Sequence, residues 1–294
     1  MFGERMLSII KEFADNSETL KEARSNVEEM SSIKEIGIYI GLFILLFIIL
    51  KIFTYIFMIY SPIKEDIFVT LGRFIIVPFV IYFYVTKIEK RSWRSIGFSK
   101  GNGFSSTLKG LLFGFLMFSA VVAIGMLLGQ FRFEGYDLSS LILVIPYFIL
   151  FAIQCFSEEM YARGWTITYF FKRHSIFLAM VINCIVFALP HLLSPGIDLL
   201  SIVNIFIVGM VFAVMFLRFD NIWVCGGVHT AWNFSQGIIL GFNVSGYTTP
   251  SIMKFSQVGQ NLINGGAFGP ESSLITTAVF IISLIIAVYY PQSK

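Results

Sequence analysis

The chain has 294 residues, of which 56% are hydrophobic and 13% are charged, and its formal net charge is +3. Soluble domains carry about a quarter charged residues, so this composition excludes a water-soluble globular protein and indicates a surface that mostly faces lipid. No stripe of basic and aromatic residues runs along the chain, so we expect membrane lipid as a partner and no nucleic acid.

Residues 1–35 mix acidic and basic residues with spaced apolar ones. The apolar positions are Leu7, Ile10, Phe13, Leu20, Val27 and Met30. This pattern predicts one or two amphipathic helices on the cytoplasmic face of the membrane, and the alternative is a solvated tail without a role. The scattered charges exclude a signal peptide, which needs an uninterrupted apolar core after a basic start.

From residue 36 onward apolar runs recur, and a helix that spans a bilayer needs about 20 such residues. We therefore predict an all-α, polytopic membrane protein with a transmembrane domain over residues 36–294 and about eight spans. The predicted spans are 36–60, 67–86, 108–129, 140–171, 175–190, 197–217, 222–242 and 273–290. The fourth run exceeds one bilayer thickness and contains Pro146, so we expect an interfacial piece or a kink near its start.

The orientation follows from basic residues in short loops, which are enriched on the cytoplasmic side. Alternate loops contain Lys87, Lys90, Arg91, Arg94, Lys100, Lys109, Lys172, Arg173 and Arg218. The loops on the other side contain Lys64, Arg132 and Lys254. We therefore predict a multi-pass protein of the cell membrane with both termini in the cytoplasm.

The three cysteines, Cys155, Cys184 and Cys225, each lie within an apolar run and form no C-x-x-C pair. We interpret them as small buried hydrophobic residues that provide neither a disulfide framework nor a zinc site. The chemistry of the chain is therefore sought among the charged side chains of its spans.

The fourth span carries Glu158, Glu159 and Arg163 in its middle, where a charge is costly and by default marks a functional site. Glu159 and Arg163 share a helix face, so we expect an ion pair. Glu158 is rotated by about 100° from that pair and has no local partner, which makes it a candidate general base. The alternative is an ion pair that only fastens two helices, with Glu158 as a bystander.

His191 follows Pro190 near the end of the fifth span, where a lone histidine would suggest a capping or interfacial role. The expected depth of His191 in the membrane favours a site residue instead. Glu158 lies 14 residues before Lys172, and His191 lies 17 residues after His174, which we expect to be solvated in its basic turn. At 1.5 Å per residue, Glu158 and His191 are both about 21–25 Å from the same turn, so they can meet.

The seventh span carries a glycine pair, Gly226 and Gly227, followed by His229 and Asn233, which share a face. The glycines admit a closely approaching backbone or ligand, and the alternative is helix packing with hydrogen bonds between spans. His229 lies only about 8–11 residues from the predicted inner surface, so a tilted or broken helix is needed to bring it level with Glu158.

Two glutamates, two histidines, an asparagine and an arginine buried together form a hydrolytic constellation. A carboxylate can accept a proton from water, an imidazole can hold that water or protonate the leaving group, and an asparagine can stabilise an oxyanion. Two histidines with a glutamate are also a ligand set that suits catalytic zinc.

Three motifs carry a family resemblance: Glu158-Glu159-x-x-x-Arg163, Phe187-x-x-x-His191 and His229-x-x-x-Asn233. In this order and on separate spans, they resemble the motifs of the CPBP family, the CAAX proteases and bacteriocin-processing enzymes, also called the Abi family. The eukaryotic type II CAAX prenyl endopeptidase belongs to this family. The similarity covers about residues 140–245. The segment Gly265–Glu271 also looks like a stretch common in bacterial members, and the alternative for it is a turn that needs glycine and proline.

The resemblance implies an eight-helix intramembrane endopeptidase with a cavity open to the cytoplasm and the bilayer and a protease core at about residues 140–290. It implies that Glu158 activates a water with help from His191, that His229 and Asn233 stabilise the oxyanion, and that the predicted ion pair organises the site. The expected substrate is a lipidated or membrane-associated protein or a peptide precursor. Whether a divalent metal such as zinc takes part is left open by the resemblance.

Other intramembrane proteases fit poorly, because H-E-x-x-H, Gly-x-Ser-x-Gly and Gly-x-Gly-Asp motifs are absent from the sequence. Two other functions stay open. Buried charges also serve proton relays, but a proton-coupled transporter is expected to show an internal repeat, and none is evident. The second is a non-catalytic membrane protein that binds bacteriocins for immunity, which a Glu158→Gln variant would distinguish from an enzyme.

Overall fold

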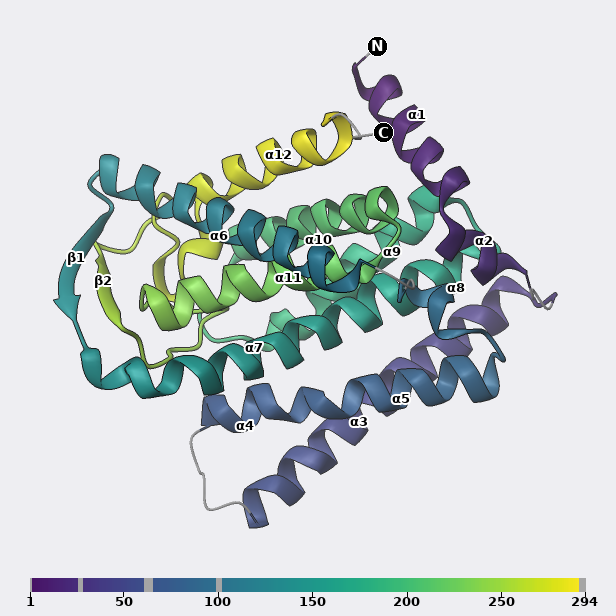
Figure 1. The fold of residues 1–294 in the computed structure, drawn as a ribbon, viewed down its shortest axis with the longest axis horizontal. Coiled ribbons are helices and arrows are strands. Elements are labelled where there is room, and N and C mark those ends of the chain that lie inside the picture. Colours follow the sequence, from purple (N-terminus) through teal and green to yellow (C-terminus); the bar gives the residue numbers. More distant parts are fainter. Residues whose placement is uncertain (1, 26–28, 61–65, 99–101, 291–294) are drawn as a thin grey trace.

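The structure is a computed structural model of the chain and describes residues 2–25, 29–60, 66–98 and 102–290. Helical segments occupy the positions of all eight predicted spans, which confirms the all-α, polytopic class. These segments contain α3 (Ser32–Tyr60), α4 (Asp66–Gly72) with α5 (Ile76–Phe83), α6 (Gly103–Leu127), α7 (Val144–Glu159) with α8 (Thr168–Phe171), α9 (Ile176–Ala188), α10 (Leu199–Phe219), α11 (Ile222–Phe234) and α12 (Leu274–Tyr289) (Figure 1).

The eight segments differ in how well they suit a bilayer. Within the described ranges, six are long and apolar enough to cross it: Ser32–Ile59, Val69–Ile88, Gly103–Leu127, Leu138–Phe171, Ile176–Leu193 and Leu199–Phe219. α12 is apolar but shorter, and α11 is buried along nearly its whole length. The count of about eight spans is therefore approximate, because α11 packs inside the bundle rather than against lipid.

Several spans change helical type partway along. α4 and α5 are joined by the 3-10 turn Arg73–Ile75, α7 and α8 by the π-helical stretch Met160–Ile167, and α11 continues into the π-helical stretch Ser235–Ile239. π-helical stretches are rare and often accompany functional sites. Two of the three π-helical stretches in the described residues follow predicted site residues within two positions, and the third, Tyr84–Ile88, does not.

The fourth span begins with a separate piece, as expected. A 3-10 helix, Leu138–Leu143, precedes α7. Pro146 lies in the first turn of α7, where its missing N–H removes no intrahelical hydrogen bond, so the proline starts the helix without kinking it.

The N-terminal segment forms two helices, α1 (Phe2–Asn16) and α2 (Glu18–Arg24), as its pattern predicted. α1 packs on α10 and α12, and α2 packs on α8. Asp220, in the turn after α10, accepts hydrogen bonds from the Ser17 hydroxyl at 2.5 Å and the Thr19 N–H at 3.2 Å. The alternative of a solvated tail is therefore wrong, and both ends of the described chain lie at one end of the bundle (Figure 1).

The turn after α8 is tied to the start of α3. Glu35 is fully buried and pairs with Arg173 at 3.2 Å and with His174 at 2.7 Å. The expectation that His174 is solvated is therefore wrong. The sequence around His174 could not indicate this, because its partner lies far away along the chain.

At the opposite end, two strands form a ribbon that the sequence analysis did not predict (Figure 1). β1 (Phe131–Tyr136) pairs antiparallel with β2 (Met253–Gln257), with Phe133 opposite Phe255 and a bulge before Gly135. The ribbon joins two loops that are distant in the sequence, so it closes the end of the bundle that carries few basic residues.

Glycines set the close packing of α11. A Cβ on Gly227 would lie 2.5 Å from the carbonyl oxygen of Thr107 on α6, and a Cβ on Gly226 would lie 2.4 Å from the ring of Phe156 on α7. A Cβ on Gly110 of α6 would likewise lie 2.3 Å from the carbonyl oxygen of Val224. The glycine pair therefore serves helix packing, the alternative to close approach of a ligand.

Candidate active site

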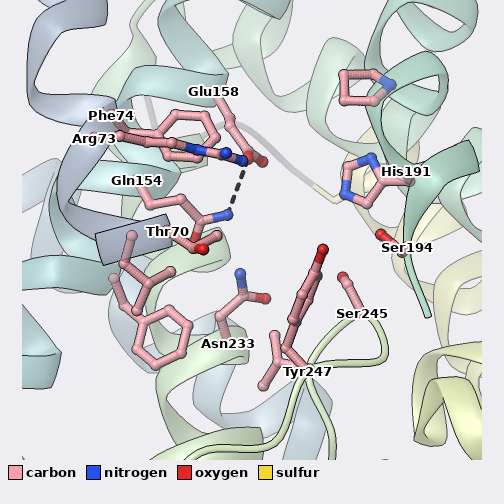
Figure 2. A pocket seen from close by; sticks show the side chains of 14 residues that line it. Thr70, Arg73, Phe74, Gln154, Glu158, His191, Ser194, Asn233, Ser245 and Tyr247 are labelled. Carbon is pink, nitrogen blue, oxygen red and sulfur yellow. Dashed lines mark hydrogen bonds between the residues drawn. The ribbon is translucent and has the colours of Figure 1, made fainter. Parts of the chain in front are cut away.

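A cavity of about 100 Å³ lies among α4, α7, α9, α11 and the loop after α11. Three of the six predicted residues line it: Glu158 from α7, His191 from the turn after α9, and Asn233 from the end of α11. Figure 2 shows these side chains on different sides of one central space. The rest of the lining consists of Thr70, Leu71, Arg73, Phe74, Phe151, Gln154, Pro190, Ser194, Val244, Ser245 and Tyr247.

Glu158 is buried, and its two carboxylate oxygens differ in their contacts. Oε1 accepts a hydrogen bond from Gln154 Nε2 at 2.9 Å. The expectation that Glu158 has no local partner is therefore wrong, because Gln154 lies one turn earlier on the same face. Within the described part of the chain Oε2 has no hydrogen-bond partner, and His229 Nε2 lies 3.9 Å from it. One oxygen is thus held in place while the other is available to accept a proton.

Glu159 joins two of the predicted site residues. Arg163 Nη1 donates to Glu159 Oε1 at 3.0 Å, and both side chains are fully buried, so the predicted ion pair is present. The same oxygen lies 3.0 Å from Nδ1 of His229. A carboxylate only accepts hydrogen bonds, so Nδ1 of His229 carries the proton that it donates to Glu159. Glu159 therefore fastens α7 to α11 and turns Nε2 of His229 toward Glu158.

The structure explains both ends of the Phe187-x-x-x-His191 motif. The guanidinium of Arg163 lies over the Phe187 ring, 4.1 Å from its centroid, and over Phe212 at 4.9 Å. The carbonyl of Phe187, near the end of α9, lies 2.9 Å from His191 Nδ1. A histidine commonly caps the free carbonyls of a helix end in this way. One residue thus supports the ion pair with its ring and orients His191 with its backbone.

His229 reaches the level of the two glutamates without any break in α11, which is α-helical from Ile222 through Phe234. The predicted need for a tilted or broken helix rested on Arg218 marking the membrane surface. Arg218 is instead buried and donates to the carbonyl of Ala287 at 2.8 Å, and α2 covers the adjoining turn through Asp220. α11 therefore starts below the surface of the protein, which places His229 deeper than its sequence position suggested.

The residues do not fit a zinc site. In the described residues no group of three His, Cys, Asp or Glu side chains is arranged to hold a metal ion. Zinc ligands converge to about 2.0–2.3 Å from one point. His191 lies on the far side of the cavity from Glu158, so these two side chains do not converge on one point (Figure 2). The chemistry proposed below therefore uses protein groups alone.

Several polar residues of the cavity were missed by the sequence analysis. Two had a visible signal: Arg73 is a charge inside the second predicted span, and Gln154 is a polar residue one turn before Glu158 in an apolar run. Ser245 and Tyr247 come from a loop, and no local pattern indicates where that loop folds back.

The segment Gly265–Glu271 supports the loop that carries Ser245 and Tyr247. Glu271 accepts a hydrogen bond from the Ser245 N–H at 2.6 Å, and the Gly246 N–H donates to the carbonyl of Phe268 at 2.8 Å. Burial raises the pKa of the Glu271 carboxyl, and the hydrogen bonds from Ser245 oppose that rise. Gly269 has φ of 111°, and a Cβ there would lie 2.3 Å from the carbonyl oxygen of Asn243. The turn interpretation of this segment therefore holds, and the turn supports one wall of the cavity.

The cavity lies toward the end of the bundle opposite the basic loops. Ser194 follows α9 and Ser245 follows α11, whereas Lys172 and Arg218 precede those helices at the other end. The resemblance implied a cavity open to the cytoplasm, and the basic loops predict that their own end is cytoplasmic. In α9 and α11 the basic end and the cavity residue lie at opposite termini of the helix.

A family model described as type II CAAX prenyl endopeptidase, Rce1-like, matches residues 138–235. No curated protein and no solved structure matches the chain. The matched segment contains all three motifs, whereas Arg73 and Tyr247 lie outside it. The resemblance carried by the motifs is therefore confirmed, and over residues 138–235 this chain matches the Rce1-like family of type II CAAX prenyl endopeptidases.

Proposed function

We propose that this protein is an intramembrane endopeptidase that hydrolyses a peptide bond in the cavity beside Glu158. Its substrate is a lipidated or membrane-associated protein, or a peptide precursor. The family match supports a CAAX-protease-type endopeptidase. The observation that carries the proposal is the convergence of a carboxylate, an imidazole and a carboxamide from three helices on one cavity.

In the proposed reaction, Glu158 is the general base. Gln154 holds Oε1, and Oε2 takes the proton of a water as that water adds to the scissile carbonyl carbon. His191 lies across the cavity with Nδ1 held by the Phe187 carbonyl, so Nε2 is left to position the water. The C–N bond then breaks as the leaving amine receives a proton from Glu158 or His191.

Asn233 and His229 are assigned to the oxyanion that forms when water adds. The Asn233 amide nitrogen lies 3.5 Å from the Cys155 sulfur, a weak acceptor that a substrate oxygen can replace. The pair of Glu159 and Arg163 keeps His229 in place. In this assignment those two residues position the site and do not touch the substrate.

A peptidome comparison tests the proposal. The wild type and Glu158→Gln are expressed at equal levels in a host membrane, and new peptide termini are sequenced. We expect termini that require Glu158 and that persist in Glu134→Gln, which neutralises an exposed acid on β1. If folded wild type generates no such termini, the enzyme proposal fails and a binding or transport role is favoured.

A further inference from the structure

Arg73 is a cation in the cavity that the three motifs do not include. It enters from the 3-10 turn between α4 and α5, within a span that is otherwise apolar and outside the family match. Its Nε atom is buried without a hydrogen-bond partner, and the described residues offer the guanidinium no ion pair. An ionisable residue inside a membrane span is costly and is therefore a functional-site hypothesis by default.

Arg73 is half-buried, whereas the buried arginines of the described bundle have acceptors. Arg163 pairs with Glu159 at 3.0 Å, Arg91 pairs with Glu89 at 2.6 Å, and Arg218 donates to the backbone at the end of α12. Arg73 is different because its guanidinium borders the cavity and forms no hydrogen bond or ion pair with the described residues, although Glu158 lies beside it. Figure 2 shows it on the wall beside Glu158, across the space from His191.

The backbone around Arg73 departs from a regular α-helix. Pro78 has no N–H, so it cannot donate to the carbonyl of Phe74 four residues earlier, and the span is 3-10 rather than α-helical at this point. The Ser157 hydroxyl donates a hydrogen bond to the Phe74 carbonyl at 3.0 Å. Ser157 directly precedes Glu158 in the chain, so this hydrogen bond couples the position of Arg73 to the position of the proposed base.

We infer that Arg73 is a specificity-determining residue that binds a carboxylate of the substrate next to the scissile bond. The inference rests on the proposed function in taking the occupant of the cavity to be a peptide. A guanidinium presents a planar fork of N–H donors that matches a carboxylate in two parallel hydrogen bonds. The carboxylate is either the free C-terminus of the peptide or an Asp or Glu side chain close to the cleaved bond.

A second role for Arg73 must be distinguished, because its charge also acts on Glu158 from the same wall. A residue that only tunes Glu158 would affect all substrates equally and would act on kcat. A residue that binds a substrate carboxylate would act on KM, and only for substrates that carry the carboxylate. Binding measured without turnover separates the two roles most directly.

The test uses Glu158→Gln in detergent as a trap that binds without cleaving. The probe is a library of lauroylated tetrapeptides in two forms, with a free C-terminal carboxylate or a C-terminal amide, and bound peptides are counted by mass spectrometry. We expect the trap to retain carboxylate-bearing peptides about ten-fold or more over those without one, the range of a hydrogen bond to a charged group. Adding Arg73→Gln should abolish this preference, and Arg73→Lys should keep part of it.

The matched control is Arg132→Gln in the same trap, which removes an exposed arginine of β1 and should leave the preference intact. Enrichment of free acids identifies the C-terminus as the ligand, and enrichment of amides that contain Asp or Glu identifies a side chain. If the trap recovers all peptides equally, or recovers none, the inference is overturned. It is also overturned if the preference for carboxylates persists when folded Arg73→Gln is added to the trap. If the trap prefers carboxylates but the wild type cleaves nothing, the proposed function is wrong and the carboxylate site is still supported.

Discussion

At the scale of single residues, one oxygen atom organises much of the site. Glu159 Oε1 contacts both Arg163 and His229, and all three side chains are buried. The guanidinium is further enclosed by the rings of Phe187 and Phe212. Removing either charge of such a pair leaves the other without compensation in a low dielectric.

Arg163→Ala tests this arrangement through stability. The substitution leaves the Glu159 carboxylate buried and unpaired, so we expect the free energy of unfolding to fall by about 3–5 kcal/mol. Thermal unfolding in detergent provides the measurement. Arg132→Ala on β1, where the side chain is exposed, serves as the control and should change little. An unchanged melting temperature for Arg163→Ala would contradict the ion-pair argument.

The sequence predicted part of this residue-level picture. The spacing of Glu159 and Arg163 predicted their ion pair, and matching depths predicted that Glu158 and His191 can meet, since both now line one cavity. Gln154 and Arg73 were missed although each is a polar residue in an apolar run. Their contribution depends on which way the helix faces, and that orientation follows from packing between distant segments.

At the scale of elements, the site depends on how closely α11 approaches α6 and α7. α11 carries both His229 and Asn233, and its glycines face the Thr107 backbone on one side and Phe156 on the other. Small residues at helix crossings allow this kind of backbone contact within membranes. The placement of His229 and Asn233 therefore depends on glycines, which carry no side chain.

Gly227→Ala should displace α11. Its Cβ would lie 2.5 Å from the Thr107 carbonyl oxygen, so we expect a loss of about 1–3 kcal/mol in stability and reduced proteolysis. Gly41→Ala on α3 is the matched control, because no atom lies within 4 Å of the added Cβ. That variant should be neutral or gain up to about 1 kcal/mol. Equal unfolding curves for the two variants would show that the crossing tolerates a methyl group.

The elements were predicted unevenly. Long apolar runs located the helical segments of all eight spans, because burial in lipid demands such runs. The π-helical and 3-10 stretches and the ribbon of β1 and β2 were not foreseen. The ribbon pairs segments more than a hundred residues apart, so its formation depends on the bundle that brings the two loops together.

At the scale of the whole molecule, the distribution of charge and the position of the cavity define a direction. The basic loops, α1 and α2 lie at one end, and the ribbon and the cavity-lining loops lie at the other (Figure 1). Enrichment of basic residues predicts that the first end is cytoplasmic. On that orientation the cavity lies toward the outer half of the bilayer, and we expect a substrate to reach it from the lipid or from the outer side.

Labelling with a membrane-impermeant maleimide on intact cells tests this orientation. The three native cysteines are buried, so their background should be low. Leu262→Cys, at an exposed position near the ribbon, should react on intact cells, and Lys21→Cys on α2 should react only after lysis. The reverse pattern would place the basic end outside and the cavity toward the cytoplasm.

The measurement that tests the central claim most directly is the turnover of a substrate identified by its new termini. With protein reconstituted in lipid vesicles, Glu158→Gln should lower kcat by about 10²–10⁴-fold, the usual contribution of a general base, while KM changes little. Glu134→Gln should match the wild type. If Glu158→Gln retains the kcat of the wild type and is equally stable, Glu158 does not activate the water, and the assignment of this cavity as a hydrolytic site is wrong.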